Sequence, residues 1–418
     1  MLRSLQLLDF SSNYLTGPLP ESIGNLSKLA WLYLYGNELS GSIPSEIGQL
    51  GSLSVLQLLG NYLTGVIPPS IGNLTKLSNL LLSQNMLFGS IPQEVGMLKS
   101  LFVLALAENN FSGSIPSKTG QLRCLSVLQL LNNNLTGVIP ASIGNLTNLS
   151  NLNVAYNILS GQIPASIGNL TSLSNLDVAD NILSGRIPAS AGKLTKLTGL
   201  YLTNNTLLGS IPPTFSNFTH LKSLQLSDNH LSGQLPENVC RRGRLTHLAV
   251  MNNNSTGQIP PSLRNCKSLY RVRLEGNHLT GNLSEAFGVY PNLSFIALSN
   301  NKFYGELSPK WGQCHNLTSL QISNNNISGK IPPELEHATQ LQELDLSPNH
   351  LIGEIPKELG SLSLMFRLLL SGNQLSGKIP LEIGVLSNLA HPNLASNNLR
   401  GPIPNQLGIN LEKAFLFH

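Results

Sequence analysis

The chain has 418 residues, and only 11% of them are charged, against roughly 25% in ordinary soluble proteins. Its hydrophobic content of 41% is too high for a disordered chain, and its net charge of +4 excludes a general nucleic-acid binder. Four cysteines are too few for a disulfide-built scaffold of this size. No apolar run reaches the roughly 18 residues of a membrane span. The first ten residues, MLRSLQLLDF, lack the features of a signal peptide.

An asparagine recurs every 24 residues, from Asn13 to Asn397. Each of these 17 asparagines is followed four residues later by Gly, and 15 of them are followed seven residues later by Pro. The positions three and eight residues before each Asn are always apolar; the position five before is apolar too, although Pro392 fits it poorly. A fixed period of this length indicates a repeat architecture. We therefore predict seventeen 24-residue repeats over residues 1–408 and a non-repeat tail over 409–418.

The spacing within one repeat predicts its local structure. Leu152 and Val154 alternate with polar residues, which is the periodicity of a strand with one buried face. We expect the side chains of Asn151, Asn153 and Ala155 to point away from the core. The repeated Asn can donate and accept hydrogen bonds, so a column of them can satisfy turn backbone groups that would otherwise be buried unpaired. A single repeat cannot bury its apolar edge alone, so stacked repeats predict a solenoid with one parallel sheet.

These residues resemble the plant-specific leucine-rich repeat, LxxLxxLxLxxNxLxGxIPxxIGNLxx. Residues 158–181, ILSGQIPASIGNLTSLSNLDVADN, are a near-complete copy of that motif. The sequence resembles the extracellular domains of plant leucine-rich-repeat receptor-like kinases, and residues 282–320 are most similar to the MIK subgroup, the male-discoverer-interacting receptor-like kinases. The resemblance implies a curved right-handed superhelix with a parallel β-sheet on its concave face.

The resemblance also implies a function. In this family the repeats bind a secreted peptide or another receptor at the extracellular face of the plasma membrane, and a leucine-rich-repeat co-receptor docks near the C-terminal repeats. A transmembrane helix and a cytoplasmic Ser/Thr kinase domain follow. The chain shows neither the family's cysteine-bearing caps nor the Gly-rich, VAIK, HRD and DFG motifs of a kinase. We therefore interpret it as a fragment, a truncated gene product or an incomplete gene model, and the resemblance implies a membrane-anchored parent. We expect no enzyme activity, cofactor or metal in the chain itself.

Side chains one, two, four, six and seven residues before each Asn should be exposed on the sheet face. Most are Ser, Asn, Gln, Ala or Thr, so departures from that background are candidate contact residues.

Trp31, Tyr33 and Tyr35 occupy alternate positions of one strand and predict an exposed apolar zone, a common mark of a partner surface. The alternative is that missing repeats covered this edge, or that the aromatic residues only cap the curvature.

A second group combines two acids with two aromatic residues in matching register over neighbouring repeats: Tyr156, Asp177, Asp180 and Tyr201. Carboxylates flanked by phenol rings would suit a Lys, Arg or hydroxyl-bearing side chain of a ligand. The alternative is that these are two solvated aspartates and two ordinary surface tyrosines.

The third group is basic. Arg271 and Arg273 lie on one face of one strand, about 6.6 Å apart, where two guanidinium groups could bind a carboxylate bidentately. His247 stands one repeat earlier, in the same column as Arg271. Residues 237–273 carry seven Arg or Lys residues and a single acid. The Arg-x-Arg matches a motif of several peptide-sensing plant receptor kinases that holds the peptide's free C-terminal carboxylate. The alternative is that Glu275 neutralises the pair internally.

Cys240 and Cys266 are one repeat plus two residues apart, on neighbouring loops, so a disulfide is geometrically conceivable; buried free thiols are the alternative. Cys266 and Cys314 are two repeats apart, about 10 Å, which exceeds the limit of about 7 Å for a disulfide. Cys124 has no obvious partner.

The chain contains fifteen Asn-x-Ser/Thr sequons, and their glycosylation would require secretion. Many arise because the repeat itself spells GNLT or GNLS. Asn253 should be a poor acceptor, because its amide is expected inside the turn. The candidate acceptors are Asn25, Asn73, Asn110, Asn145, Asn169, Asn217, Asn292 and Asn316.

The leading interpretation is a peptide-binding receptor ectodomain fragment. We expect the peptide's C-terminal carboxylate at the Arg271–Arg273 pair and its earlier residues over Tyr201, Asp177 and Tyr156, toward the aromatic zone. One alternative is a secreted inhibitor or scaffold, similar to the plant leucine-rich-repeat proteins that block fungal polygalacturonases. Another is a truncated paralogue without a function.

Overall fold

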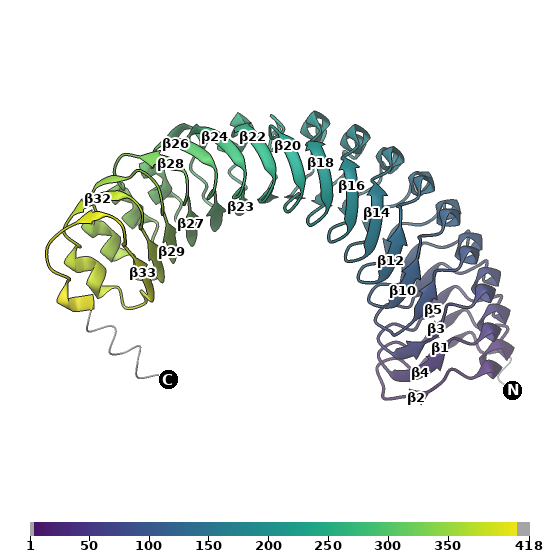
Figure 1. The fold of residues 1–418 in the computed structure, drawn as a ribbon. Coiled ribbons are helices and arrows are strands. Elements are labelled where there is room, and N and C mark those ends of the chain that lie inside the picture. Colours follow the sequence, from purple (N-terminus) through teal and green to yellow (C-terminus); the bar gives the residue numbers. More distant parts are fainter. Residues whose placement is uncertain (1–3, 408–418) are drawn as a thin grey trace. The chain divides into compact units, whose positions relative to one another are not determined.

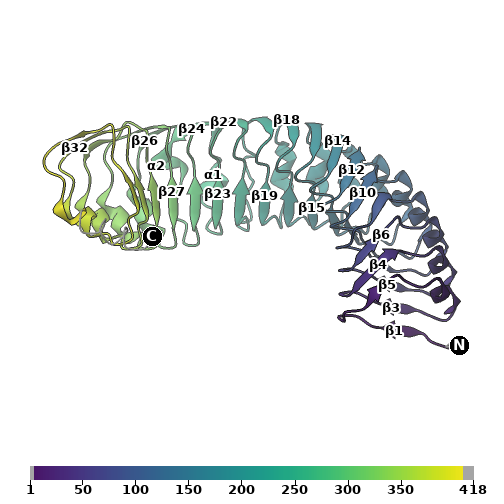
Figure 2. The same ribbon diagram turned by 60° about the horizontal axis from the view of Figure 1, so that its bottom comes forward.

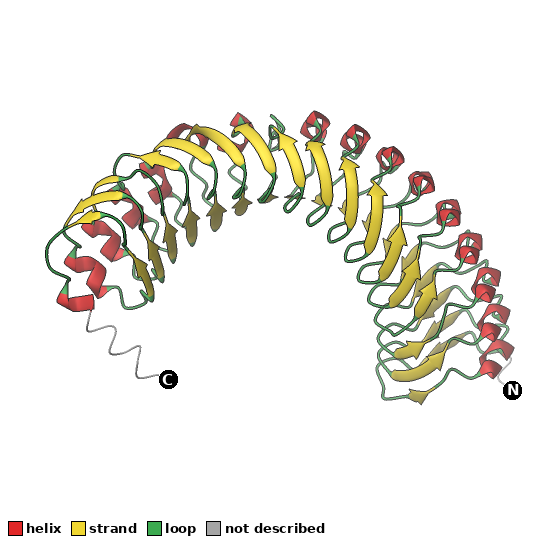
Figure 3. Ribbon diagram, in the orientation of Figure 1, coloured by secondary structure: helices red, strands yellow, loops and turns green. Residues whose placement is uncertain are grey.

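The computed structural model describes residues 4–407, so the predicted tail at 409–418 lies outside the described residues. The chain divides into two compact units, the first ending at Leu221 and the second beginning at Lys222. In each unit a repeat contributes a first strand to a parallel sheet, then a second strand, and in most repeats a short helix (Figures 1 and 3). First strands line the concave side of each unit and helices its convex side. These repeats form the predicted solenoid.

The first unit contains nine described first strands, which pair in parallel in chain order. They are β1 (Leu7–Asp9), β3 (Trp31–Tyr33), β5 (Val55–Gln57), β7 (Asn79–Leu81), β9 (Val103–Ala105), β11 (Val127–Gln129), β13 (Asn151–Asn153), β15 (Asn175–Asp177) and β17 (Gly199–Tyr201). The second strands are β2 (Thr16–Gly17), β4 (Glu38–Ser42), β6 (Tyr62–Thr64), β8 (Phe88–Ser90), β10 (Asn110–Gly113), β12 (Asn134–Gly137), β14 (Ile158–Gln162), β16 (Ile182–Arg186) and β18 (Thr206–Ser210). Nine 3-10 helices follow them: η1 (Glu21–Asn25), η2 (Ser45–Gln49), η3 (Pro69–Asn73), η4 (Gln93–Met97), η5 (Ser117–Gln121), η6 (Ala141–Asn145), η7 (Ala165–Asn169), η8 (Ala189–Lys193) and η9 (Pro213–Asn217).

The second unit contains eight described first strands in the same arrangement (Figure 2). They are β19 (Ser223–Gln225), β21 (His247–Ala249), β23 (Arg271–Arg273), β25 (Phe295–Ala297), β27 (Ser319–Gln321), β29 (Glu343–Asp345), β31 (Arg367–Leu369) and β33 (His391–Asn393). The second strands are β20 (His230–Gly233), β22 (Asn254–Gln258), β24 (His278–Asn282), β26 (Lys302–Glu306), β28 (Asn326–Ser328), β30 (Ile352–Glu354), β32 (Gln374–Gly377) and β34 (Asn398–Leu399). Its helices are α1 (Pro261–Arg264), α2 (Leu283–Ala286), η10 (Pro309–Gln313), η11 (Pro333–His337), η12 (Lys357–Ser361) and η13 (Leu381–Val385).

The core is built from the predicted periodic positions. Leu152 and Val154 are fully buried, as their alternation predicts. The expectation that Ala155, two residues before Asn157, is exposed is wrong, because this residue is only 1% exposed. Ala249 and Ala297, at other sheet-face positions, are buried as well. A methyl group is too short to rise above longer side chains in the adjacent repeats, so small residues on this face form its floor.

The repeated asparagines form the predicted internal ladder, as Asn133 illustrates. Its Oδ1 accepts the backbone N–H of Phe111 at 3.0 Å, and its Nδ2 donates to the carbonyls of Leu106 and Leu130, both at 3.1 Å. One side chain therefore pairs backbone groups of its own repeat and of the preceding one. This satisfies polar groups in a buried turn, where an unpaired group would be costly.

Two glycine columns allow the repeats to approach closely. Gly113 has φ +71°, in the left-handed region that L side chains rarely adopt. On the helix side, a Cβ at Gly120 would lie 2.3 Å from the carbonyl oxygen of Ser142 in the next repeat. The short helices of adjacent repeats therefore pack with their backbones in close contact, which a larger residue at Gly120 would prevent.

Pro392 lies in β33, whose described partner is β31. A strand that pairs on one side tolerates the missing N–H of proline.

Among residues 4–407, no helix is long and apolar enough to cross a membrane.

Candidate ligand-binding site

The basic strand β23 lies between β21 and β25 in the second unit. Its alternation places Val272 in the core, 2% exposed, and turns Arg271 and Arg273 to the concave side. The register aligns Arg271 with His247 on one side and with Phe295 on the other. Arg273 lies between Ala249 and Ala297, which are both buried. The sheet face beside this arginine therefore carries only short methyl side chains.

Arg271 is exposed, and its guanidinium lies 4.1 Å from the centroid of the Phe295 ring. A cation at this distance over an aromatic face is held by the ring's quadrupole. Among the described residues, no carboxylate forms an ion pair with Arg271. The sequence interpretation did not single out Phe295, although an aromatic residue in the same register one repeat later was a usable signal. The stacking orients the guanidinium and leaves its N–H groups available to a ligand.

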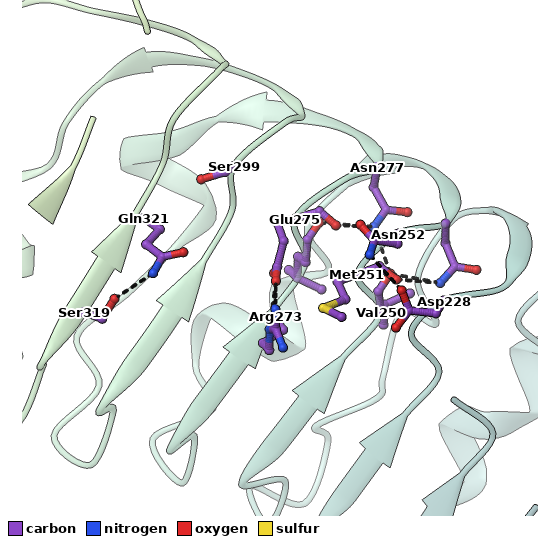
Figure 4. Close-up of polar contacts among 12 residues, drawn as sticks. Asp228, Val250, Met251, Asn252, Arg273, Glu275, Asn277, Ser299, Ser319 and Gln321 are labelled. Carbon is purple, nitrogen blue, oxygen red and sulfur yellow. Dashed lines mark hydrogen bonds and ion pairs between the residues drawn. The ribbon is translucent and has the colours of Figure 1, made fainter. Parts of the chain in front are cut away.

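Arg273, unlike Arg271, forms an ion pair within the chain. Its Nε donates to Oε1 of Glu275 at 2.8 Å, and its Nη2 donates to the same oxygen (Figure 4). The two side chains are 34% and 15% exposed. The internal ion pair that the sequence left as an alternative is therefore present. Oε2 of Glu275 is buried and has no hydrogen-bond partner among the described residues. Of the two arginines of β23, Arg271 is therefore the one that has no ion-pair partner among the described residues.

His247 is half-buried beside Arg271, and its ring packs against Tyr270 with 5.5 Å between the ring centroids. Its Nδ1 is 2.9 Å from Oγ1 of Thr246. The predicted column of His247 and Arg271 is present, but the histidine packs onto an aromatic residue that the sequence interpretation missed. Tyr270 is 49% exposed and forms a rim beside the arginine.

The sheet face beyond Phe295 is polar and internally paired. Nε2 of Gln321 donates to Oγ of Ser319 at 3.1 Å (Figure 4) and to Oε2 of Glu343 at 2.7 Å. Nη1 of Arg367 lies 3.1 Å from Oε1 of Glu343. Arg367 has the same register as Arg271 but is neutralised within the chain. The comparison makes Arg271 distinctive among the arginines of this column.

The aspartate–tyrosine group lies in the first unit. Asp177 and Tyr201 are aligned on neighbouring strands, but no described hydrogen bond joins their side chains. A Cβ at Gly199 would lie 2.6 Å from the Tyr201 ring, so the ring folds over the glycine of its own strand. Oδ1 of Asp180 accepts a 2.8 Å hydrogen bond from Nδ2 of Asn204. Tyr156 is 58% exposed, and the nearby Asp180 carboxylate is the main cause that raises its phenol pKa.

The aromatic strand also belongs to the first unit. Trp31 is 39% exposed, whereas Tyr33 and Tyr35 are half-buried. Trp31 is aligned with Val55 on one side and with Leu7, itself exposed, on the other. The exposed apolar surface therefore includes Leu7, which the sequence interpretation did not list.

Cys240 and Cys266 are joined by a disulfide, with 5.9 Å between their Cα atoms. Cys124 is free and exposed. Cys314 is free and buried, and its Sγ accepts the N–H of Tyr290 at 3.4 Å. Burial raises the pKa of the Cys314 thiol, which keeps it protonated.

The candidate glycosylation residues are all exposed. Asn25, Asn73, Asn145, Asn169 and Asn217 each end a convex-side helix, whereas Asn110 begins strand β10. Asn292 and Asn316 donate Nδ2 hydrogen bonds to the carbonyls of Lys267 and Pro291. Asn253 is 7% exposed, and its amide is bonded inside the turn as expected.

Within the described part of the chain, no group of three or more His, Cys, Asp or Glu residues could hold a metal ion.

Family models of leucine-rich repeats match several parts of the chain: a leucine-rich repeat region over residues 1–109, leucine rich repeat models over 291–351, and further repeats at 124–146, 148–170, 196–218 and 220–241. The ectodomain of the Arabidopsis receptor kinase HAESA, in complex with an extended IDA peptide hormone, is 38% identical with a TM-score of 0.86. That match covers 95% of this chain and 71% of the HAESA chain. The chain belongs to the leucine-rich-repeat family.

Other solved leucine-rich-repeat structures agree with this assignment. The plant peptide hormone receptor RGFR1 in complex with RGF2 is 34% identical, with a TM-score of 0.82, over 97% of this chain and 73% of the receptor. HAESA in complex with IDA and the co-receptor SERK1 is 35% identical, with a TM-score of 0.72, over 96% of this chain and 80% of that one. No curated protein matches the sequence. This leucine-rich-repeat chain therefore has the fold of plant receptor kinase ectodomains, a binding fold.

Proposed function

We propose that this chain is the ligand-recognition region of a plant receptor-like kinase of the MIK type, and that it binds a secreted peptide at the extracellular face of the plasma membrane. The proposal is supported by the likeness to HAESA and RGFR1, whose structures contain the peptide hormones IDA and RGF2. The HAESA complex that includes SERK1 supports a leucine-rich-repeat co-receptor as a second partner.

The observation that carries the proposal is the state of Arg271. Its guanidinium is exposed, oriented by Phe295 and unpaired, whereas Arg367 in the same column is neutralised by Glu343. The free C-terminal carboxylate of a peptide would accept hydrogen bonds from Arg271 in a bidentate arrangement. Nη1 of Arg273, which has no partner among the described residues, would donate to the same carboxylate from two residues along the strand. His247 and Tyr270 would line the approach.

The experiment compares a random decapeptide library with free C-terminal acids and the same library with amidated C-termini. The wild type should enrich peptides that have a free C-terminal carboxylate, and Arg271→Ala should lose that preference. Arg367→Ala is the matched control, because it removes the same residue type in the same register but from an internal ion pair. Equal enrichment of acid and amide by the wild type would refute the carboxylate site.

The first unit offers two further contact surfaces, each proposed separately. The acids of the aspartate–tyrosine group suit a cationic ligand side chain, and the strand with Trp31, Tyr33 and Tyr35 suits an apolar one. Peptides selected on the wild type should lose affinity for Asp180→Asn when they contain Lys or Arg. Peptides without a cationic residue should bind this variant as they bind the wild type.

A further inference from the structure

The positive charge of the chain is concentrated in one short stretch. Residues 237–273 contain seven Arg or Lys residues and one acid, a net charge of +6. The whole chain has a net charge of +4, so its remaining residues carry a net −2. Two of the seven cations, Arg271 and Arg273, belong to the sheet-face site already described. The other five lie outside it, in the segments that precede β21 and β23; four are in turns or loops, and Arg264 is the last residue of α1.

These five cations are exposed, and we call them the cationic edge: Arg241, Arg242, Arg244, Arg264 and Lys267. Among the described residues, none of them forms an ion pair with a carboxylate. They come from two consecutive repeats, within the second unit. Arg244 lies three residues before His247, and Lys267 four residues before Arg271, so the edge directly precedes the two strands of the sheet-face site along the chain.

The disulfide between Cys240 and Cys266 joins the two turns that carry the edge. Arg241 and Arg242 directly follow the first cysteine, and Lys267 directly follows the second. A covalent link with 5.9 Å between its Cα atoms therefore keeps like charges together that would otherwise repel one another. Fixing a cluster of unpaired cations disfavours the free protein and favours a state in which an anion neutralises them.

We infer that the cationic edge binds an acidic segment of a polypeptide, a run of Asp and Glu residues. Four of its five cations are arginines, whose guanidinium groups match carboxylates bidentately. The cations stand at different register positions in the two repeats, whereas a regular anionic polymer would favour one column continued over many repeats. An extended acidic segment requires only the charges.

The test uses the full chain and a fluorescent twelve-residue peptide of alternating Glu and Gly, with both ends blocked. The amidated C-terminus removes the group that the Arg271 site is proposed to bind, so the two proposals can fail independently. The double variant Arg241→Gln/Arg244→Gln should bind the peptide at least about fivefold more weakly at low ionic strength. Added salt should remove the difference, because exposed charges are screened.

Lys193→Gln/Lys196→Gln is the matched control. These exposed lysines occupy the same register positions two repeats earlier, outside the edge. We expect their loss to change peptide binding less than twofold, although the change in net charge is identical. Peptide binding that is equal in both double variants would overturn the proposal. Heparin or single-stranded RNA bound as tightly as the peptide, with the same dependence on Arg241 and Arg244, would overturn the choice of a polypeptide.

A third variant tests the disulfide while all five cations remain. Cys240→Ser/Cys266→Ser should weaken binding of the acidic peptide, because the two turns are no longer held together. Unchanged affinity in this variant would refute the role given to the disulfide. A thermal melt of each variant checks that the solenoid remains folded, so that a loss of affinity is assigned to the edge.

Discussion

The guanidinium of Arg271 lies over the ring of Phe295, whereas the guanidinium of Arg273, two residues along the same strand, is paired with Glu275. Two arginines that are equivalent in the sequence motif therefore differ in the structure. One is oriented and unpaired; the other is largely neutralised. A ligand carboxylate that binds here gains most from Arg271, and Arg273 contributes through the part of its guanidinium that Glu275 leaves free.

Phe295→Leu should reduce the preference for peptides with a free C-terminal acid. The substitution keeps an apolar side chain but removes the aromatic face that orients Arg271. A cation–π contact at an exposed site contributes about 0.5–1 kcal/mol, so the affinity should fall about two- to fivefold. Titration calorimetry with one selected peptide measures this, and Phe102→Leu, an exposed aromatic residue of the other unit, is the control. An equal loss in the two variants would argue against a specific role of the stacking.

Glu275→Gln should strengthen binding of a free C-terminal acid. The substitution removes a carboxylate that competes for Arg273 and that repels the incoming carboxylate. A charge-assisted hydrogen bond becomes available to the ligand, so we expect about a three- to tenfold gain in affinity. Glu343→Gln, which frees Arg367 further along the sheet, should leave the affinity unchanged. A weaker complex in Glu275→Gln would mean that Glu275 mainly positions Arg273.

Asn133→Ala should destabilise the first unit strongly. The substitution leaves the N–H of Phe111 without its side-chain partner, whereas the carbonyl of Leu106 keeps the hydrogen bond from Nδ2 of Asn109. A buried polar group left unpaired costs about 1–3 kcal/mol, so the free energy of unfolding should fall by about that amount. Asn134→Ala, at the adjacent exposed position, is the control and should change it by less than about 0.5 kcal/mol. Urea denaturation followed by circular dichroism compares the two variants. A similar loss of unfolding free energy in both would contradict the stabilising role of the asparagine ladder.

Asp177→Asn should stabilise the fold at neutral pH. Burial is the main cause that raises the pKa of the Asp177 carboxyl above 3.8; the Asp180 charge adds to it, and the hydrogen bond from the Ala179 N–H opposes it. Because the folded state favours the protonated form, the stabilising contribution of this carboxyl is complete below pH 3.8 and is lost as the pH rises through the raised pKa. The variant should therefore exceed the wild type in stability at pH 7 and match it below pH 3.8.

Urea denaturation midpoints at pH 7 and pH 3 measure this difference. Asp9→Asn is a control with the opposite sign, because hydrogen bonds from the Ser11 side chain and backbone lower the pKa of Asp9. Its carboxylate contributes stability above the ordinary pKa, so its replacement should not raise stability at pH 7. An Asp177→Asn variant that is no more stable than the wild type at pH 7 would contradict the desolvation argument.

The period of 24 residues was sufficient to predict the solenoid, the buried leucines and the asparagine ladder. Each of these features depends on contacts that recur between the same positions of adjacent repeats, so one motif specifies them all. For the same reason the alignment of His247 with Arg271 was predictable. The disulfide between Cys240 and Cys266 was only one of two alternatives, since spacing limits the distance between two loops but not the direction of their side chains.

The repeat pattern is enough to predict the fold and the column in which each candidate residue stands. The contacts of each side chain are visible only in the folded chain: Arg273 pairs with Glu275, Arg271 stacks on Phe295, and Tyr201 folds over Gly199. These contacts depend on rotamers and on the size of neighbours one repeat away, which differ between repeats and break the periodicity. A repeated pattern specifies the backbone and the core because both are averaged over many copies, whereas a binding site is built from the residues that depart from that pattern.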